Sequence, residues 1–369
     1  MRLRSIVATP ARLAARGLVR VRTARWPDHS HLFAVGDRGG WSVEEDADHL
    51  AAAARRLGFE VAPAGWAGFA VRQSVFLTSH FEALSPRWLD TSHRLATAYL
   101  HGRPGTPGAP EFDKTFEALR RRPDRIARVQ VTHGEMQQLV LSAGVATERV
   151  FRIPIGIDLE HFPLTTPELR AEARVGLGLP ETAFVVGSFQ KDGVGWDEGL
   201  EPKLVKGPDV FVGALEWLRT YAPELHVLLT GPARGYVKRE LERLGVPYRH
   251  VLAGTRVELA RAYHALDVYL VSSRQEGGPK AVLEAMAAGV PLVSTSVGQA
   301  QDLVERGRNG WLVEVEDAEG LAAWATRVRD GAGAGVLEAG RETAERYAHE
   351  RLDDLWAKLL EGFVTREGR

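Results

Sequence analysis

The stretch from residue 266 to residue 294 constrains the fold of this chain more than any other. A mostly apolar run at residues 266–271 predicts a buried strand, and residues 291–293 predict another. Between them lie a Gly-Gly-Pro turn and a helix that is apolar nearly all round, so we expect this helix to be buried. Strand, glycine turn, helix and strand form a βαβ unit with room for a ligand at the helix N-terminus.

Two carboxylates flank the turn. Glu276 follows the first strand, and Glu284 falls in the second turn of the helix. Both can reach one polyhydroxylated ligand, because carboxylates accept hydrogen bonds from pairs of hydroxyl groups. The alternative is two ordinary solvated helix glutamates, but a glutamate on a buried helix needs a polar partner. Gly277 and Gly278 allow a close approach of the backbone to a ligand, and Pro279 suits the first helical position.

Residues 276–291 resemble the donor-binding signature of the retaining glycosyltransferases of family 4: two glutamates separated by seven residues, then Ala-Met-Ala-x-Gly-x-Pro. The resemblance implies the α/β GT-B fold, with two Rossmann-like domains facing across a cleft and a C-terminal helix that crosses back to the first domain. It also implies that Glu276 holds the hydroxyls of a donor sugar and Glu284 those of a ribose. Beside them the donor would contact Gly277, Gly278, Pro279 and Lys280.

Strands alternate with helices from about residue 31 to residue 315, which predicts parallel sheets. Residues 150–162 resemble the segment by which the family's chains cross between domains. We therefore predict four parts, in chain order: a basic segment 1–26, an acceptor-side Rossmann-like domain 27–155, a nucleotide-sugar donor-binding Rossmann-like domain 156–345, and a returning C-terminal helix 346–369.

Residues 187–209 combine a strand end, a long glycine-rich loop and a helix N-terminus, an arrangement that suits a phosphate. The resemblance implies that Lys206, just before Gly207, holds the donor diphosphate. The family's usual arginine after the strand is Ser188 here, so Lys191 is its expected replacement. The alternative for Lys191 is a solvated loop lysine.

Further candidates rest on the same resemblance. Gly231 follows a strand and would line the nucleotide pocket, and Arg256 lies in a turn that would meet the base. We interpret Arg234 as a helix-start residue, and Gln299 stands where the family commonly has a Gly-Gly pair.

The first domain supplies other candidates. His101 ends a predicted strand and resembles the family's histidine near the donor sugar and the acceptor, while Gly39 and Gly40 resemble its glycine loop near the diphosphate. His80 and His133 are weaker candidates on the acceptor side.

The composition excludes several classes of protein. The net charge of −1 over 369 residues gives no reason to expect a nucleic acid partner, and the absence of cysteine excludes disulfides and thiolate metal sites. Asp46 and Asp48 fit an Asp-x-Asp metal motif. However, we expect them early in a helix, where they would point roughly 160–200° apart. We predict no cofactor and no essential metal.

The N-terminal residues 1–26 contain seven arginines and no acidic residue, with apolar residues interleaved. They predict a basic amphipathic segment on an anionic membrane surface, and so a cytoplasmic protein, peripheral on the inner face of the membrane. The alternative is a solvated leader. Pro10 and Gly17 are expected to interrupt a long helix.

Together these features predict a metal-independent, retaining glycosyltransferase. Its donor would be a nucleotide-diphosphate sugar, with a UDP-sugar favoured over GDP-mannose, and its acceptor a hydroxyl of a glycan or lipid-linked molecule. Such an enzyme would serve cell-envelope, exopolysaccharide or glycolipid assembly. The alternatives are a GT-B phosphorylase, a nucleotide-sugar epimerase and a non-catalytic glycan-binding subunit.

Overall fold

The computed structural model describes residues 10–36 and 42–366. The chain divides into two compact units, each built around one six-stranded sheet whose neighbouring strands pair in parallel. Unit 1 comprises Met1–Tyr99, Glu111–Ile153 and Asp353–Arg369. Unit 2 comprises Leu100–Pro110 and Pro154–Leu352. Residues 100–110 thus cluster with unit 2, although they fall within the predicted segment 27–155.

The sheet of unit 1 has the strand order β2-β1-β3-β4-β5-β6. Its strands are β1 (His31–Val35), β2 (Glu60–Val61), β3 (Ser74–Leu77), β4 (Arg94–Ala98), β5 (Ile126–Val131) and β6 (Val150–Arg152). Its helices are α1 (Pro10–Thr23), α2 (Ser42–Arg56), α3 (His80–Ala83), α4 (Pro86–Leu89), α5 (Pro110–Arg121), α6 (Gly134–Ser142) and α15 (Asp353–Leu360). Short 3-10 turns are η1 (Ala64–Trp66), η2 (Pro123–Arg125) and η3 (Thr147–Arg149).

The sheet of unit 2 has the strand order β12-β11-β10-β7-β8-β9. Its strands are β7 (Phe184–Phe189), β8 (Leu225–Thr230), β9 (Tyr248–His250), β10 (Val268–Val271), β11 (Leu292–Thr295) and β12 (Trp311–Val313). Its helices are α7 (Pro167–Leu177), α8 (Pro208–Tyr221), α9 (Gly235–Leu244), α10 (Arg256–His264), α11 (Lys280–Ala288), α12 (Ala300–Leu303), α13 (Ala318–Arg329) and α14 (Leu337–Arg346). Its 3-10 turns are η4 (Leu159–His161), η5 (Leu204–Lys206), η6 (Ala332–Val336) and η7 (His349–Leu352).

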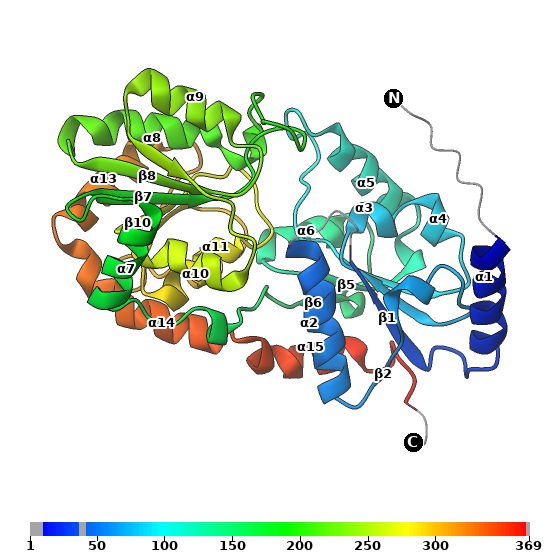
Figure 1. Cartoon of the computed structure of the whole chain (residues 1–369). Coiled ribbons are helices and arrows are strands. Elements are labelled where there is room, and N and C mark those ends of the chain that lie inside the picture. Colours follow the sequence, from blue (N-terminus) through cyan, green and yellow to red (C-terminus); the bar gives the residue numbers. More distant parts are fainter. Residues whose placement is uncertain (1–9, 37–41, 367–369) are drawn as a thin grey trace. The chain divides into compact units, whose positions relative to one another are not determined.

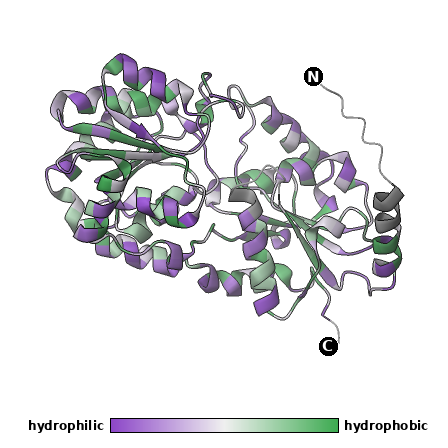
Figure 2. Ribbon diagram, in the orientation of Figure 1, coloured by the Kyte–Doolittle hydropathy of each residue, from purple (hydrophilic) through white to green (hydrophobic). Residues whose placement is uncertain are grey.

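Helices cover both faces of the unit 2 sheet, with α8, α9 and α13 on one side and α7, α10, α11 and α14 on the other (Figure 1). Successive residues of β7 therefore enter different cores: Val185 packs with α10 and α11, while Phe184 and Val186 pack with α8 and α9. The inner strands β7, β8 and β10 are mostly apolar and buried, as expected for a sheet that is covered on both faces, whereas the edge strand β9 is polar and partly exposed (Figure 2).

The strand order of unit 2 reverses between β7 and β10, because β8 and β9 lie on one side of this pair and β11 and β12 on the other. In an open parallel sheet, ligands bind outside the carboxyl ends of the strands at such a point. The loops that follow β7 and β10 are therefore the place to look for a site.

The C-terminal helix α15 belongs to unit 1. Arg56 on α2 forms an ion pair with Asp353 at 2.7 Å, and Trp356 packs edge-on against Phe76 of β3 with ring centroids 5.9 Å apart. This return begins at Asp353, seven residues after the predicted start at residue 346.

The basic helix α1 begins at Pro10 and runs unbroken to Thr23, so the expected interruption at Gly17 is wrong. Pro10 is the first helical residue, where no backbone N–H is needed, and a single interior glycine costs a helix only about 1 kcal/mol. Among the described residues, no helix combines the length and the apolar character needed to cross a membrane.

Candidate functional site

Glu276 lies in the loop between β10 and α11 and forms an ion pair with Lys206 from the loop after β7. The Nζ atom of Lys206 donates to both carboxylate oxygens, at 2.7 and 2.8 Å, and the hydroxyl of Ser273 donates at 2.8 Å. Burial opposes ionisation of Glu276, but the lysine and this hydroxyl still hold its pKa below the usual value. The loops on either side of the strand-order reversal thus place one carboxylate against one ammonium group.

The two loops are fastened to each other by their backbones. The amides of Arg274 and Gln275 both donate to the carbonyl oxygen of Val205, at 3.0 and 3.1 Å. Gly207 has a φ of +59°, and a Cβ atom there would lie 1.9 Å from the carbonyl oxygen of Ser272. No other residue fits this position without moving the backbone, so the glycine fixes Lys206 at the end of β10.

Arg274 adds a side-chain lock between the same loops. Its guanidinium donates two hydrogen bonds, both 2.7 Å long, to the carboxylate of Asp209, which lies in the first turn of α8. It also donates to Leu204 and Glu316. Sequence reasoning did not single out Arg274, because its partners lie in other parts of the chain: Leu204 in η5, Asp209 in α8 and Glu316 after β12.

Glu284 occupies the second turn of α11 and is buried, as are its neighbours on this helix from Val282 to Ala288. Arg256, the first residue of α10, donates to one carboxylate oxygen at 2.8 Å, and the hydroxyl of Tyr263 donates to the other at 2.9 Å. Burial and then the charge of Glu284 raise the pKa of Tyr263 well above its usual value, so this phenol stays protonated. Tyr263 is a partner that sequence reasoning missed.

The turn between the two glutamates requires its glycines. A Cβ atom on Gly277 would lie 2.4 Å from Cβ of Leu100, and one on Gly278 would lie 2.6 Å from the side chain of Gln299. Pro279 precedes α11 rather than starting it, so its predicted place at the first helical position is wrong by one residue. Lys280 is the first residue of the helix and is half-buried.

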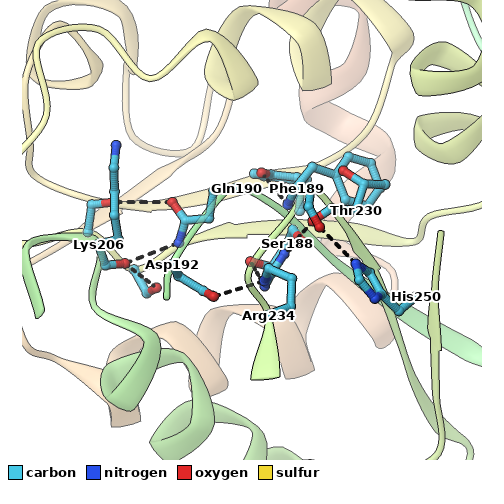
Figure 3. Close-up of polar contacts among 12 residues, drawn as sticks. Ser188, Phe189, Gln190, Asp192, Lys206, Thr230, Arg234 and His250 are labelled. Carbon is cyan, nitrogen blue, oxygen red and sulfur yellow. Dashed lines mark hydrogen bonds and ion pairs between the residues drawn. The ribbon is translucent and has the colours of Figure 1, made fainter. Parts of the chain in front are cut away.

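Arg234 braces the start of the long loop after β7, and Figure 3 shows it reaching toward Ser188 and Asp192. It is fully buried, donates to the carbonyl oxygen of Ser188 at 2.6 Å and to that of Thr230 at 2.7 Å, and pairs with the equally buried Asp192 at 2.9 Å. The interpretation of Arg234 as only a helix-start residue is therefore wrong. Burial raises the pKa of Asp192 in spite of this arginine.

Lys191 lies over the ring of Trp196, with Nζ 4.4 Å from the ring centroid. Burial lowers its pKa. Gly231, at a φ of +84°, lies beside the same loop: a Cβ atom there would be 3.1 Å from the carbonyl oxygen of Gln190. Its own carbonyl oxygen is hydrogen-bonded to Nε2 of His250 at 2.8 Å.

His101 belongs to the segment Leu100–Pro110 of unit 2, where Lys206, Glu276 and Lys203 act on it electrostatically. Burial, followed by the positive charge of Lys206, lowers the pKa of His101 to about 4. The imidazole is therefore neutral at pH 7 and has one donor and one acceptor nitrogen.

The other histidine candidates lie in unit 1. His80 is buried and stacks on Tyr99 with ring centroids 4.3 Å apart. His133 is also buried, with Nδ1 3.0 Å from the hydroxyl of Thr132. Gly39 and Gly40 lie outside the described residues. Asp46 and Asp48 both fall in the first half of α2, as expected.

Gln299 uses its side chain within the fold. It accepts from the amide of Ile155 at 2.8 Å and donates to the carbonyl oxygen of the same residue at 3.2 Å. It thereby clamps the start of the segment Pro154–Leu352 to the turn that carries Gly278.

Comparisons with known proteins show that the chain is similar to glycosyltransferases. Residues 199–330 match the family model described as "Glycosyl transferases group 1". The chain is 33% identical over 202 residues to D-inositol 3-phosphate glycosyltransferase 1 of Catenulispora acidiphila, covering 50% of this chain and 44% of that protein. It is 35% identical over 214 residues to D-inositol 3-phosphate glycosyltransferase of Xylanimonas cellulosilytica, covering 54% and 46%. A lipopolysaccharide core biosynthesis mannosyltransferase, LpsB of Rhizobium meliloti, is 29% identical over 47% of this chain and 49% of its own length. The chain thus spans about half the length of these curated relatives.

Solved structures share the fold over most of the chain. HepE of Anabaena in complex with UDP-glucose matches with a TM-score of 0.69 and 20% identity, covering 90% of this chain and 98% of that one. Sucrose-phosphate synthase of Thermosynechococcus elongatus matches with a TM-score of 0.68 and 18% identity, covering 91% and 99%. The likeness confirms the predicted GT-B α/β fold class.

Proposed function

We propose that this chain, whose residues 199–330 match the family model of the glycosyl transferases group 1, is a retaining glycosyltransferase that moves a sugar from a nucleotide-diphosphate sugar to a hydroxyl acceptor. The observation that carries this proposal is the ion pair of Lys206 with Glu276 beside the strand-order reversal of unit 2. A cation and a carboxylate side by side suit a ligand in which a diphosphate adjoins a sugar, since the ammonium meets the phosphate and the carboxylate meets the hydroxyls.

Each group then has a separate role. Lys206 stabilises the charge that develops on the leaving diphosphate, and Glu276 orients the donor sugar beside the turn of Gly277 and Gly278. Glu284, held by Arg256, accepts from the ribose hydroxyls. Neutral His101 offers hydrogen bonds to the donor sugar without adding charge. The remaining donor contacts are Lys191, Gly231, Pro279, Lys280, Gly39 and Gly40.

The reaction we propose is a substitution on one face of the sugar. The bond between C1 and the diphosphate oxygen breaks, and its electron pair goes to the diphosphate. The acceptor oxygen then bonds to C1 from the same face, and its proton passes to the diphosphate oxygen. No carboxylate of the described site is assigned as a nucleophile, so this route needs no covalent intermediate. We expect transfer to continue in EDTA.

A UDP-sugar is the favoured donor over GDP-mannose. HepE, whose fold this chain shares, is described in complex with UDP-glucose, with UDP, and with UDP and glucose. LpsB, by contrast, is named a mannosyltransferase of lipopolysaccharide core biosynthesis. We propose a hydroxyl of a glycan or lipid-linked acceptor in cell-envelope, exopolysaccharide or glycolipid assembly, with His80 and His133 as the acceptor-side residues of unit 1.

A thermal-shift screen against UDP, GDP, ADP and TDP tests the nucleotide site. A ligand that binds only the native state raises the apparent stability, by about 2.7 kcal/mol at a concentration of 100 Kd. We expect UDP to give the largest shift and the Glu284→Gln variant to lose it. If none of the four shifts the melting temperature, the proposal of a nucleotide-sugar enzyme is wrong.

Product analysis separates the remaining alternatives. A phosphorylase would form a sugar phosphate from free phosphate, an epimerase would isomerise the donor in the absence of an acceptor, and a glycan-binding subunit would release no nucleotide. We expect nucleoside diphosphate and a new glycoside, formed with the same anomeric configuration as the donor, which NMR of the product would detect.

We also propose a cytoplasmic location with peripheral attachment to the inner face of the membrane through residues 1–26. In the described part of this segment, Leu18 and Val21 are 71% and 58% exposed on one side of α1, and Arg20 and Arg25 are exposed as well. Apolar residues among arginines suit an anionic lipid surface. Vesicles with anionic lipid should bind the intact chain and not one that lacks residues 1–26; equal binding would contradict this attachment.

A further inference from the structure

The backbone that follows His101 is held by the side chain of Gln275, the residue just before Glu276. The amides of Gly102 and Arg103 donate to Oε1 of Gln275 at 3.0 and 2.9 Å. Its Nε2 atom donates to the hydroxyl of Thr106 at 2.9 Å. One side-chain amide thus makes three hydrogen bonds to the segment Leu100–Pro110 of unit 2.

The residue on the other side of Glu276 contacts the same segment. Gly277 packs so closely on Leu100 that a Cβ atom would lie 2.7 Å from the carbonyl oxygen of Leu100. Both chain neighbours of Glu276 therefore touch the loop that carries His101. The loop has no regular structure from residue 100 to residue 109, and its glycines at 102, 105 and 108 all have positive φ. Its conformation accordingly depends on contacts from outside it.

Gln275 is itself fixed relative to Lys206. Its amide donates to the carbonyl oxygen of Val205 at 3.1 Å, one residue before the lysine. The same residue is therefore joined to the lysine loop through its backbone and to the histidine loop through its side chain. The charged groups that act on His101 come from these two attachments: Lys203 and Lys206 from one loop, and Glu276 from the other.

We propose that Gln275 is a positioning residue that holds His101 at the Glu276–Lys206 pair, where the imidazole meets the donor sugar. The assignment of the sugar to this place rests on the proposed function. Gln275 does not touch the reacting atoms; it acts through the loop. Without its three hydrogen bonds the loop remains attached to the chain, but the half-buried imidazole is no longer kept beside Glu276.

Kinetics of a double-mutant cycle test the role in catalysis. Gln275→Ala should lower kcat about tenfold, the scale of one or two lost hydrogen bonds in the positioned state. Gln275→Ala combined with His101→Ala should be no slower than His101→Ala alone, because both changes remove the same imidazole from the site. Losses of kcat that multiply in the double variant would overturn the proposal.

Two measurements on the free protein are independent of any transferase activity. In Gln275→Ala, hydrogen exchange at the amides of Gly102 and Arg103 should accelerate, and the NMR titration midpoint of His101 should rise from about 4 toward the ordinary value of about 6.5 as the ring becomes solvated. If both are unchanged, Gln275 does not hold the loop. If both change but no nucleotide sugar is used, the positioning stands and the proposed function fails.

Gln73→Ala is the matched control. The side chain of Gln73 is buried and, like that of Gln275, ties backbone segments together. It accepts from the amide of His31 at 3.0 Å and donates to the carbonyl oxygen of Pro27 at 3.0 Å, all within unit 1. Its loss should destabilise unit 1 without changing the titration of His101 or the exchange of residues 102–103. If both variants changed the titration of His101 equally, Gln275 would contribute only to general stability and would not position His101.

Discussion

The carboxyl edges of the two sheets differ in charge. At the edge of unit 2 the side chains that follow the strands form ion pairs, namely Lys206 with Glu276, Arg256 with Glu284, and Arg234 with Asp192. At the edge of unit 1 the described residues that follow β3, β4 and β5 carry hydroxyls, imidazoles and an aromatic ring; these are Thr78, His80, Tyr99, Thr132 and His133.

This difference indicates what each edge can hold. A buried cation that already has a carboxylate partner can exchange it for a phosphate, because either anion satisfies the same donors. The edge of unit 2 therefore suits a charged ligand. At the edge of unit 1, Glu135 lies 3.9 Å from the imidazole of His133 rather than beside a lysine or an arginine. Hydroxyls and imidazoles suit a ligand rich in hydroxyl groups. The following predictions test the two halves of this comparison.

The largest effect is expected from Asp192→Ala. It leaves the fully buried guanidinium of Arg234 without its carboxylate, and removing one partner of a buried ion pair costs about 3–5 kcal/mol. Urea unfolding followed by circular dichroism would measure this loss. Glu240→Ala breaks the surface pairs with Arg239 and Arg243 on α9, whose guanidinium groups are exposed, and should have little effect. A similar stability for both variants would mean that the buried pair is not a structural brace.

Glu276→Gln should separate the chemistry from the binding. We expect kcat to fall by about 100-fold or more, the scale for losing a positioned charge contact, and the same for Lys206→Ala. Binding of the nucleoside diphosphate alone should be unchanged or tighter in Glu276→Gln, because the ammonium of Lys206 no longer has a competing carboxylate. Calorimetry with UDP would show this. If Glu276→Gln weakens the binding of UDP as much as Lys206→Ala does, Lys206 does not exchange the carboxylate of Glu276 for a phosphate.

The site residues that could be predicted from the sequence are those with local signals. Glu276 and Glu284 flank a glycine turn at the start of the buried helix α11. Lys206 precedes Gly207, which has a positive φ and caps the N-terminus of helix α8. Turns and helix starts depend on neighbouring residues, so a short stretch of sequence is enough to identify them. The GT-B fold class followed from one such stretch through the family it resembles.

The residues that could not be predicted have distant partners. Arg234 reaches across from the turn after β8 to β7, and Gln275 binds a loop that lies 172 and 173 residues away in the chain. Such contacts depend on which loops the sheet order brings together, and no local pattern encodes that order. For the same reason the sequence did not indicate that residues 100–110 cluster with unit 2.

Arg256→Ala tests the second ion pair of the charged edge. We expect the KM for the donor to rise about tenfold with little change in kcat, because a ribose contact is made equally in the ground state and in the transition state. Tyr263 still donates to Glu284 in this variant, which limits the effect. Arg261→Ala, an exposed residue on the same helix, is the control and should leave the KM unchanged. A lower kcat with an unchanged KM would show that Arg256 acts in the chemical step and not in ribose binding.

Lys191→Ala should have the smallest effect and decides which cation serves the diphosphate. Its ammonium lies over the exposed ring of Trp196, a contact worth about 0.5–1 kcal/mol at such sites, and it can leave that ring only at a cost of this size. We therefore expect the affinity for UDP to fall only about twofold to fivefold, well short of the loss in Lys206→Ala. Trp196→Ala is the matched control: it frees the ammonium and should leave UDP binding unchanged or slightly tighter. A loss in Lys191→Ala as large as that in Lys206→Ala would show that Lys191 takes the place of the arginine that Ser188 replaces, and the charged edge would then extend into the loop after β7.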